Sequence, residues 1–457
     1  MKKVFFLQLI VILFLLNGCV SVTSNLSKIH PRTIDGYAVL YQKYLDSNET
    51  NNLLWNYETG SLSYFLSKYD QSVNHFDKAE WLIKEYEERV LAKNSLENIG
   101  SVLTNDNFMD YQPKEYEKIM VNTYKGIDFI LLGDFINARI EFNRALVRQD
   151  RAREFFKKEI ELKKKEIEAE QKHANNPFVG SIAKDNKTTD VILRRYSNLF
   201  AFKPYPDFVN PFTTYMAGLF FLNIGDYQKA TDLLKESYGM IVESSKGSEY
   251  IAKDLKLAIS QKRSLAPLKE HYTWVIFLNG RSTFKKQIRI DVPLFLFPHS
   301  NAYYTGIALP ILVPGIQAYN TLFVSNAKQK KETKTIASMD NVIKTEFKKR
   351  FPLIMSRALT RTVVQTLIQV EAYRKLGAWE GVIASIYQSL VNQADLRMWN
   401  ELPSEFQIVR LKTTKTLQIA TKTKTFFSMQ TDPKRNYIVF VTIQEQNNQP
   451  IIQYQRF

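Results

Sequence analysis

The feature that most constrains this fold is the segment YKGIDFILLGDFINARIEFNRALVRQ, residues 124–149. Small and aromatic residues recur in it at the spacings of two helices. Gly126 and Phe129 lie three residues apart and share one helix face, where the glycine lets a partner helix approach closely. Gly133 marks the break, because glycine readily adopts the left-handed conformation that ends many helices. We therefore expect an αα-hairpin here.

The second helix of this hairpin has a packed stripe of its own. Asp134 can cap its first turn, and Ala138, Phe142 and Ala145 recur along one face at intervals of four and three residues. This pattern resembles the tetratricopeptide (TPR) repeat, a helical module that holds protein partners. The resemblance implies a binding role and leaves the partner open.

The same offsets occur twice more, beginning at Gly60 and at Gly218. The first copy is weaker because Ser replaces Phe, Gly or Ala at three of its positions. The other copy keeps Phe221, Gly225 and Ala230. The copies begin 66 and 92 residues apart, whereas a regular solenoid repeats at even intervals. We therefore predict an irregular helical array over residues 36–270.

The N-terminus has the features of a lipoprotein signal peptide. Two lysines precede the apolar run 4–16, which is too short to span a bilayer, a task that takes about 20 residues. The following sequence, Leu-Asn-Gly-Cys, resembles the bacterial lipobox. The resemblance implies that residues 1–18 are removed and that Cys19 receives acyl chains such as palmitate. Val20 after the cysteine favours the outer membrane, with the protein on its periplasmic face. The alternative is an ordinary signal peptide with a chance cysteine.

Charge and cysteine content agree with an exported, anchored protein. Cys19 is the only cysteine, so a disulfide within the chain is impossible. Residues 19–35 are polar, and we expect them to form a tether.

The net charge is +16. On an exported protein this charge favours anionic lipids, lipopolysaccharide or peptidoglycan as partners, rather than nucleic acid. A generally basic, solvated surface is the alternative. The charged stretch 148–173 predicts a long solvent-facing helix.

The pattern changes near Tyr272. Residues 273–280 and 287–297 have the composition of strands, and 306–315 is too rich in proline for a central strand. Helical patterns fill 339–397, with a kink or a new helix at Pro352, and strand patterns fill the tail. We expect a domain over 271–457 with a mostly antiparallel sheet packed by helices. The predicted fold class is therefore α+β, mostly α.

Signatures of catalysis are missing from the sequence. The five histidines are dispersed, and no HExxH or GxSxG motif, phosphate-binding glycine loop or Cys–His pair occurs. We therefore predict no catalytic residue, metal or cofactor. Two carboxylates facing one sugar leave no spacing signature, so a glycosidase remains an open alternative.

One other segment, ADLRMWNELPSEFQIVRL at 394–411, combines polar and aromatic residues before a strand pattern. Arg397 and Trp399 are candidate recognition residues, since Arg and Trp are common at binding hot spots. The alternative is a structural hinge, with Asp395 paired to Arg397 and Trp399 in the core.

Several segments together resemble a family of uncharacterised bacterial outer-membrane lipoproteins with TPR-like repeats. They are the lipobox, the two stronger repeats, WVIFLNG, the block MDNVIKTEFKKRFPLIMSRALTRT at 339–362 and the 394–411 segment. The resemblance implies a non-enzymatic scaffold that holds other envelope proteins, linked to peptidoglycan synthesis or envelope assembly. The alternative function is a structural subunit that assembles through edge strands of its C-terminal β domain.

Overall fold

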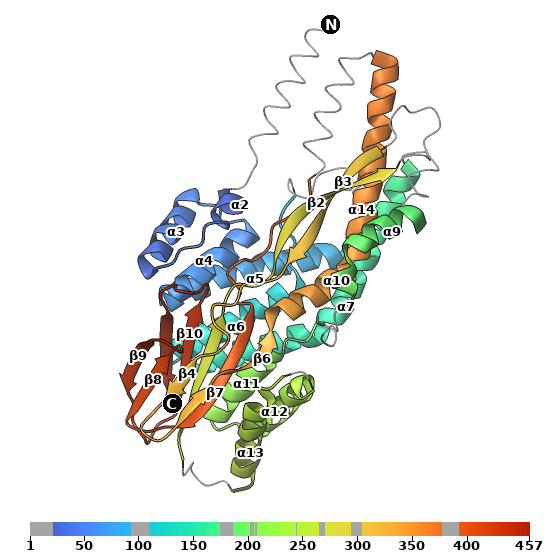
Figure 1. Ribbon diagram of the computed structural model, residues 1–457. Helices are drawn as coiled ribbons and strands as arrows, with labels where there is room; N and C mark the ends of the chain where they lie inside the picture. The colour runs from blue at the N-terminus through green and yellow to red at the C-terminus, as the bar shows by residue number, and fades with distance from the viewer. Residues whose placement is uncertain are drawn as a thin grey trace.

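The computed structural model describes residues 22–92, 109–173, 186–201, 205, 208–243, 245–264, 270–293, 304–376 and 393–457. Helices of the first half form an array, and strands of the second half form mostly antiparallel sheets beside it (Figure 1). The predicted fold class, α+β and mostly α, is confirmed. In the described part of the chain, no helix is long and apolar enough to cross a membrane.

The helical array contains the three predicted hairpins as neighbours. They are α4–α5, α6–α7 and α11–α12; α5 packs on α6, and α11 packs on both α6 and α7. The bounds of the array helices are α2 (Val22–Leu26), α3 (Ile34–Ser47), α4 (Leu53–Phe65), α5 (Tyr69–Ala92), α6 (Glu115–Leu132), α7 (Phe135–His173), α11 (Pro211–Asn223), α12 (Tyr227–Ile241) and α13 (Ser248–Ser264).

Residues at equivalent positions in the three hairpins have the same structural role. A Cβ atom on Gly126 would lie 2.9 Å from the ring of Phe142, so the glycine is what allows α6 and α7 to pack this closely. At the turns, Gly133 and Gly225 have φ angles of 77° and 83°, and Ser67 takes the same left-handed conformation in the first hairpin. The turn chemistry expected from the sequence is therefore present.

The remaining predicted packing residues lie between the helices. Ala138, Ala145, Ala230 and Phe221 are fully buried. Phe129 is partly buried and packs against the same core. These residues hold the hairpins together and leave little of their own surface for a partner.

β1 (Tyr272–Asn279) is the centre of the main sheet, whose strand order is β11-β10-β1-β7-β6. It pairs in parallel with β10 and antiparallel with β7. The other bounds in this sheet are β6 (Lys334–Ser338), β7 (Glu405–Lys412), β10 (Tyr437–Ile443) and β11 (Ile451–Arg456). A smaller sheet, β5-β4-β8-β9, contains β4 (Phe323–Ser325), β5 (Lys330–Glu332), β8 (Thr416–Ala420) and β9 (Thr425–Gln430).

The main sheet packs directly on the first helices of the hairpins. Phe212 of α11 stacks on Phe406 of β7, with ring centroids 3.6 Å apart. Trp399, which precedes β7, stacks on Tyr57 of α4 at 4.7 Å. One hydrophobic core therefore runs from α3 to β11 and crosses the predicted domain boundary at residue 270.

An extension projects from this core (Figure 1). It consists of α9 (Asn186–Arg195), α10 (Ser197–Ala201), the hairpin of β2 (Phe284–Pro293) and β3 (Tyr304–Val313), and α14 (Met339–Leu376), which share a second apolar cluster. Pro352 lies inside α14, which continues through it. Pro310 lies in β3, where a two-stranded hairpin leaves an edge that tolerates proline.

The described part of the predicted tether is folded onto the body. Thr23 is fully buried, and its Oγ1 donates to a carboxylate oxygen of Glu49 at 2.7 Å. The backbone N–H of Ile34 donates to Gln449 at 3.1 Å. From residue 22 onward, the segment predicted to form the tether therefore packs against the body, because its short polar side chains and backbone find partners there. Cys19 and residues 1–18 lie outside the described residues.

Candidate functional site

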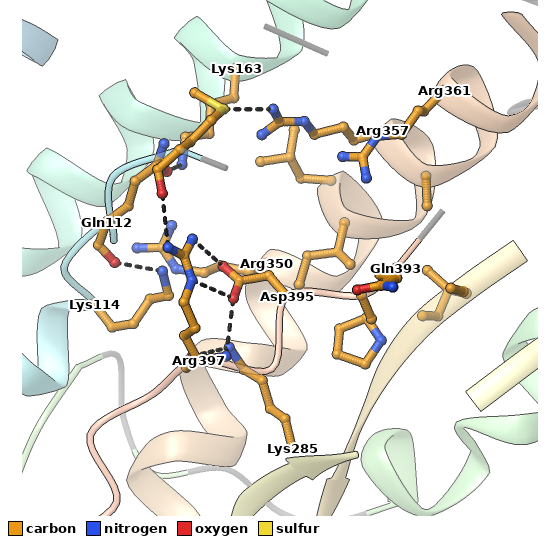
Figure 2. A pocket seen from close by; sticks show the side chains of 18 of the residues that line it. Gln112, Lys114, Lys163, Lys285, Arg350, Arg357, Arg361, Gln393, Asp395 and Arg397 are labelled. Atoms are coloured by element: carbon orange, nitrogen blue, oxygen red, sulfur yellow. Dashed lines mark hydrogen bonds and ion pairs between the residues drawn. The ribbon is translucent and has the colours of Figure 1, made fainter. Parts of the chain in front are cut away.

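A small, strongly basic pocket lies where the helical array meets the extension (Figure 2). Its volume is about 120 Å³. Segment 109–114, α7, β2, β3, α14 and segment 393–397 contribute its walls. The described lining contains seven cationic side chains and two carboxylates, namely Lys114, Lys163, Lys285, Arg350, Arg357, Arg361 and Arg397 against Asp110 and Asp395.

Contacts between α7 and α14 build one wall. Glu159 of α7 is 1% exposed and lies 2.8 Å from Lys163 Nζ and 2.9 Å from Arg350 Nη2. Burial alone would raise the pKa of Glu159, but Arg350 and Lys163 hold it well below its ordinary value. Glu159 and Lys163, four residues apart on α7, therefore form an ion pair. The expectation of a solvent-facing helix is wrong here, because α14 covers this part of α7.

The arginines of α14 reach the pocket from one helix face. Arg350, Arg357 and Arg361 are spaced by seven and four residues, which places them on the same side of the helix. Arg350 and Arg361 are both 6% exposed. Glu346 accepts a hydrogen bond from Arg350 Nε at 2.7 Å, and an Arg357 Nη donates to the sulfur of Met109 at 3.6 Å. The guanidinium groups of Arg350 and Arg357 are thus held in place near the cavity.

The segment before β7 closes the pocket from the other side. The carboxylate of Asp395 lies 3.0 Å from Arg397 Nε. Arg397 Nη1 donates to the Met109 carbonyl at 2.8 Å, and Lys285 Nζ donates to the Arg397 carbonyl at 3.0 Å. Burial would raise the pKa of Asp395, but the nearby cations Lys285 and Arg397 lower it to about 2. Asp395 therefore stays ionised and holds Arg397 at the pocket.

The two candidate recognition residues have different environments. Trp399 is fully buried, and its Nε1 donates to Ser61 Oγ at 2.8 Å. It has no exposed surface for a partner. Arg397 is partly exposed and lines the pocket. This is the arrangement that the hinge interpretation of the sequence predicts, with the difference that Arg397 also belongs to a cavity.

Lys114 has an unusual protonation equilibrium. Its Nζ donates to the Gln112 carbonyl at 2.7 Å. Burial, reinforced by the cations Arg350 and Lys285, lowers the pKa of Lys114 to about 7. An anion placed beside it would favour the protonated form. The pocket can therefore take up a proton together with a negatively charged group.

The sequence predicts only a small part of this site. Arg397 is a candidate recognition residue, whereas Lys114, Lys163, Lys285 and the arginines of α14 are not among the predicted site residues. Their contributing segments are widely separated in the chain. The available signal was the arginine spacing on the predicted helix, which placed several cations on one face.

The cationic side chains of the pocket can bind a negatively charged group. The described lining contains no Ser, Thr, Cys or His side chain that could act as a nucleophile. No cluster of His, Cys, Asp and Glu suited to a metal ion occurs among the described residues. No protein-family model matches the chain, and no curated protein is significantly similar to it.

Proposed function

We propose that this protein binds an anionic group of the size of phosphate in the basic pocket, as a lipid-anchored, non-catalytic protein of the cell envelope. The proposal that the pocket binds an anion rests on the excess of cationic side chains in its lining. Arg and Lys are the side chains that proteins use for phosphate and carboxylate groups. The envelope part rests on the lipobox-like sequence that ends at Cys19.

Basic side chains outnumber carboxylates in the described lining of the pocket. Seven lysine and arginine side chains line it, whereas Asp110 and Asp395 are the two carboxylates of that lining. Glu159 and Glu346 lie behind the lining and pair with Arg350. Like charges repel strongly where water is excluded, so a bound anion would stabilise the arrangement.

Two adjacent lysines of β2 provide a matched test. Lys285 lines the pocket, whereas Lys286 points to the opposite face of the strand and is exposed. Calorimetric titration with inorganic phosphate should show binding to the unchanged protein. Lys285→Gln should weaken it about tenfold or more, since a hydrogen bond to a charged group is worth roughly 1.5–3 kcal/mol.

Lys286→Gln removes the same charge from the same strand and should leave the affinity within about twofold, since exposed charges are largely screened. Failure of the unchanged protein to bind phosphate, or equal weakening by both substitutions, would contradict the proposal.

A scaffold function for other envelope proteins is the second candidate. The face formed by α4, α6 and α11 is covered by the protein's own main sheet, so a partner would contact the outer helices. Ile136 is 77% exposed on α7, and Ile140 and Val147, which follow on the same side, are 42% and 44% exposed. This outer stripe favours a protein contact there.

Photo-crosslinking in cells tests the scaffold candidate. A crosslinker at position 136 should give a discrete adduct that Ile140→Glu removes. A crosslinker at Val39, which is 58% exposed on α3, is the control and should not give this adduct. The same pattern of adducts from both positions would contradict a specific contact on the outer stripe.

A further inference from the structure

A wider groove adjoins the basic pocket. Its volume is about 710 Å³, within the range of roughly 300–1,000 Å³ that holds small organic ligands. Segment 48–54, one side of α5 and segment 109–113 form its walls. Met109, Asp110 and Arg397 line both cavities. The two cavities therefore lie side by side and share part of their lining.

The two cavities differ in chemistry. In segment 48–54 the groove is lined by amide and hydroxyl side chains. Three of them, Asn48, Thr50 and Asn51, are exposed. Unlike the lysine and arginine side chains of the basic pocket, which only donate, these groups can both donate and accept hydrogen bonds. Such mixed capacity suits the hydroxyl and amide groups of a sugar better than it suits an acyl chain.

An aromatic side chain completes the groove. Trp81 of α5 lines it and is 54% exposed, which is unusual for so large an apolar group. Lys78 Nζ lies 4.1 Å from the centroid of the Trp81 ring and supports it from the same helix. An indole offers a broad apolar surface with a polar N–H at its edge. The apolar face of a sugar ring fits this combination.

The wall between the cavities is held by residues of the basic pocket. Segment 109–113 is connected to Arg397 through the Met109 carbonyl and to Arg357 through the Met109 sulfur. Tyr111 on this segment lines the groove, and its hydroxyl donates to Glu117 of α6. The two cavities are thus parts of one arrangement.

We infer that the ligand is an anionic glycan, with its acidic group in the basic pocket and its sugar rings in the groove. This inference rests on the proposed anion-binding function and adds the class of ligand. A phosphate ester and a sugar carboxylate share the required chemistry. The binding experiment below distinguishes them.

Four probes separate the contributions of the two cavities. They are inorganic phosphate, N-acetylglucosamine, N-acetylglucosamine 1-phosphate and glucuronic acid, each titrated calorimetrically into the protein. The sugar phosphate should bind at least tenfold more tightly than inorganic phosphate if the acidic group is a phosphate ester. Glucuronic acid should be the tighter ligand of the two acidic sugars if the group is a carboxylate.

Substitutions then assign the sugar to the groove. Trp81→Ala should reduce the affinity for the favoured acidic sugar to that for inorganic phosphate and leave phosphate binding unchanged, whereas Trp81→Phe should retain most of the gain. Asn51→Ala should lower the same affinity from the opposite wall. Both positions are exposed, and an unchanged melting temperature shows that each variant is folded.

The outcomes separate this inference from the proposed function. If phosphate binds and neither acidic sugar binds more tightly, the glycan inference is wrong and the anion site stands. The same conclusion follows if Trp81→Ala weakens phosphate and sugar phosphate equally. If no anion binds, the proposed function is wrong and the glycan inference falls with it.

Discussion

Phe142 of α7 fills the space that a side chain on Gly126 of α6 would need, since a Cβ atom there would lie 2.9 Å from the Phe142 ring. The two residues are 16 positions apart in the sequence. The contact sets how closely the two helices of the hairpin pack. It also explains why the hairpin can be recognised from residue spacing, because both halves of the contact lie within one short segment.

The equivalent contacts in the other hairpins predict that glycine-to-alanine substitutions lower the free energy of unfolding by different amounts. A Cβ atom on Gly60 would lie 2.6 Å from Phe76, and one on Gly218 would lie 3.0 Å from Leu234. Alanine gains up to about 1 kcal/mol of helix propensity over glycine, whereas overpacking a core costs typically about 1–3 kcal/mol.

We expect Gly60→Ala to lower the free energy of unfolding by about 1–2 kcal/mol and Gly218→Ala to change it by less than about 1 kcal/mol. The difference arises because the flexible end of the Leu234 side chain can move aside more easily than the packed ring of Phe76. Urea denaturation of both variants measures this. Equal losses would show that the close approach is not the cause.

Gly225 and Gly239 predict effects of opposite sign. A Cβ atom on either residue would meet nothing within 4 Å. Gly225 has φ 83° at the end of α11, whereas Gly239 lies inside α12. We expect Gly225→Ala to destabilise the protein by about 1–2 kcal/mol through left-handed strain and Gly239→Ala to stabilise it by up to about 1 kcal/mol. Thermal unfolding should give shifts in opposite directions, and shifts in the same direction would contradict this explanation.

The ion pair between Glu159 and Arg350 predicts a large loss of stability. Glu159→Gln leaves two buried cations with less balancing charge, and breaking a buried pair typically costs about 3–5 kcal/mol. Glu161→Gln, two residues along the same helix at an exposed position, is the control and should have almost no effect. Guanidinium denaturation measures both. A loss below about 1 kcal/mol for Glu159→Gln would mean that the buried pair is not important for stability.

The pKa of Lys114 predicts a pH dependence of anion binding. The protonated amine attracts an anion, and the pKa in the free protein is about 7. Affinity should therefore fall as the pH rises above about 7. Sulfate is the suitable probe, because its charge is constant in this range. Lys114→Arg should remove most of the pH dependence, since arginine stays charged. A flat profile for the unchanged protein would contradict a role for Lys114.

The same shift affects the stability of the free protein. The folded-state pKa of Lys114 lies below its ordinary value of 10.5, so the unfolded chain binds more protons between pH 7 and 10.5. This residue therefore makes the free energy of unfolding rise with pH across that window. Saturating sulfate should reduce the rise, because the anion favours the protonated amine.

The shared core predicts that the two halves of the chain depend on each other. Removing residues 271–457 would expose Phe212, Tyr57 and the other apolar side chains that the main sheet covers. We expect the fragment 22–270 to aggregate and the whole chain to unfold in one transition. Size-exclusion chromatography and calorimetry test this. A monomeric, cooperatively folded fragment would show that the helical array is an independent domain.

The helical hairpins could be predicted from the sequence because their determinants are local. Gly126, Gly133 and Phe142 act within one segment, and the strand pattern of residues 273–280 is a continuous apolar run that favours a buried strand. A further local signal lies in helix α11. Helix α11, PFTTYMAGLFFLN, is apolar on nearly all sides, which is typical of a helix buried all round.

The sequence by itself therefore determined the repeated hairpins, the change to strands near Tyr272 and the general excess of positive charge. Tertiary structure decided that the main sheet covers the first helices, that segment 22–35 packs on the body, and that Lys114, Lys285 and Arg361 share one cavity. The physical reason is the distance along the chain over which each interaction acts. Helix and turn preferences depend on residues within a short segment. The pocket instead requires α7, α14 and segment 393–397 to meet in space, and residue spacing within one segment does not predict such contacts.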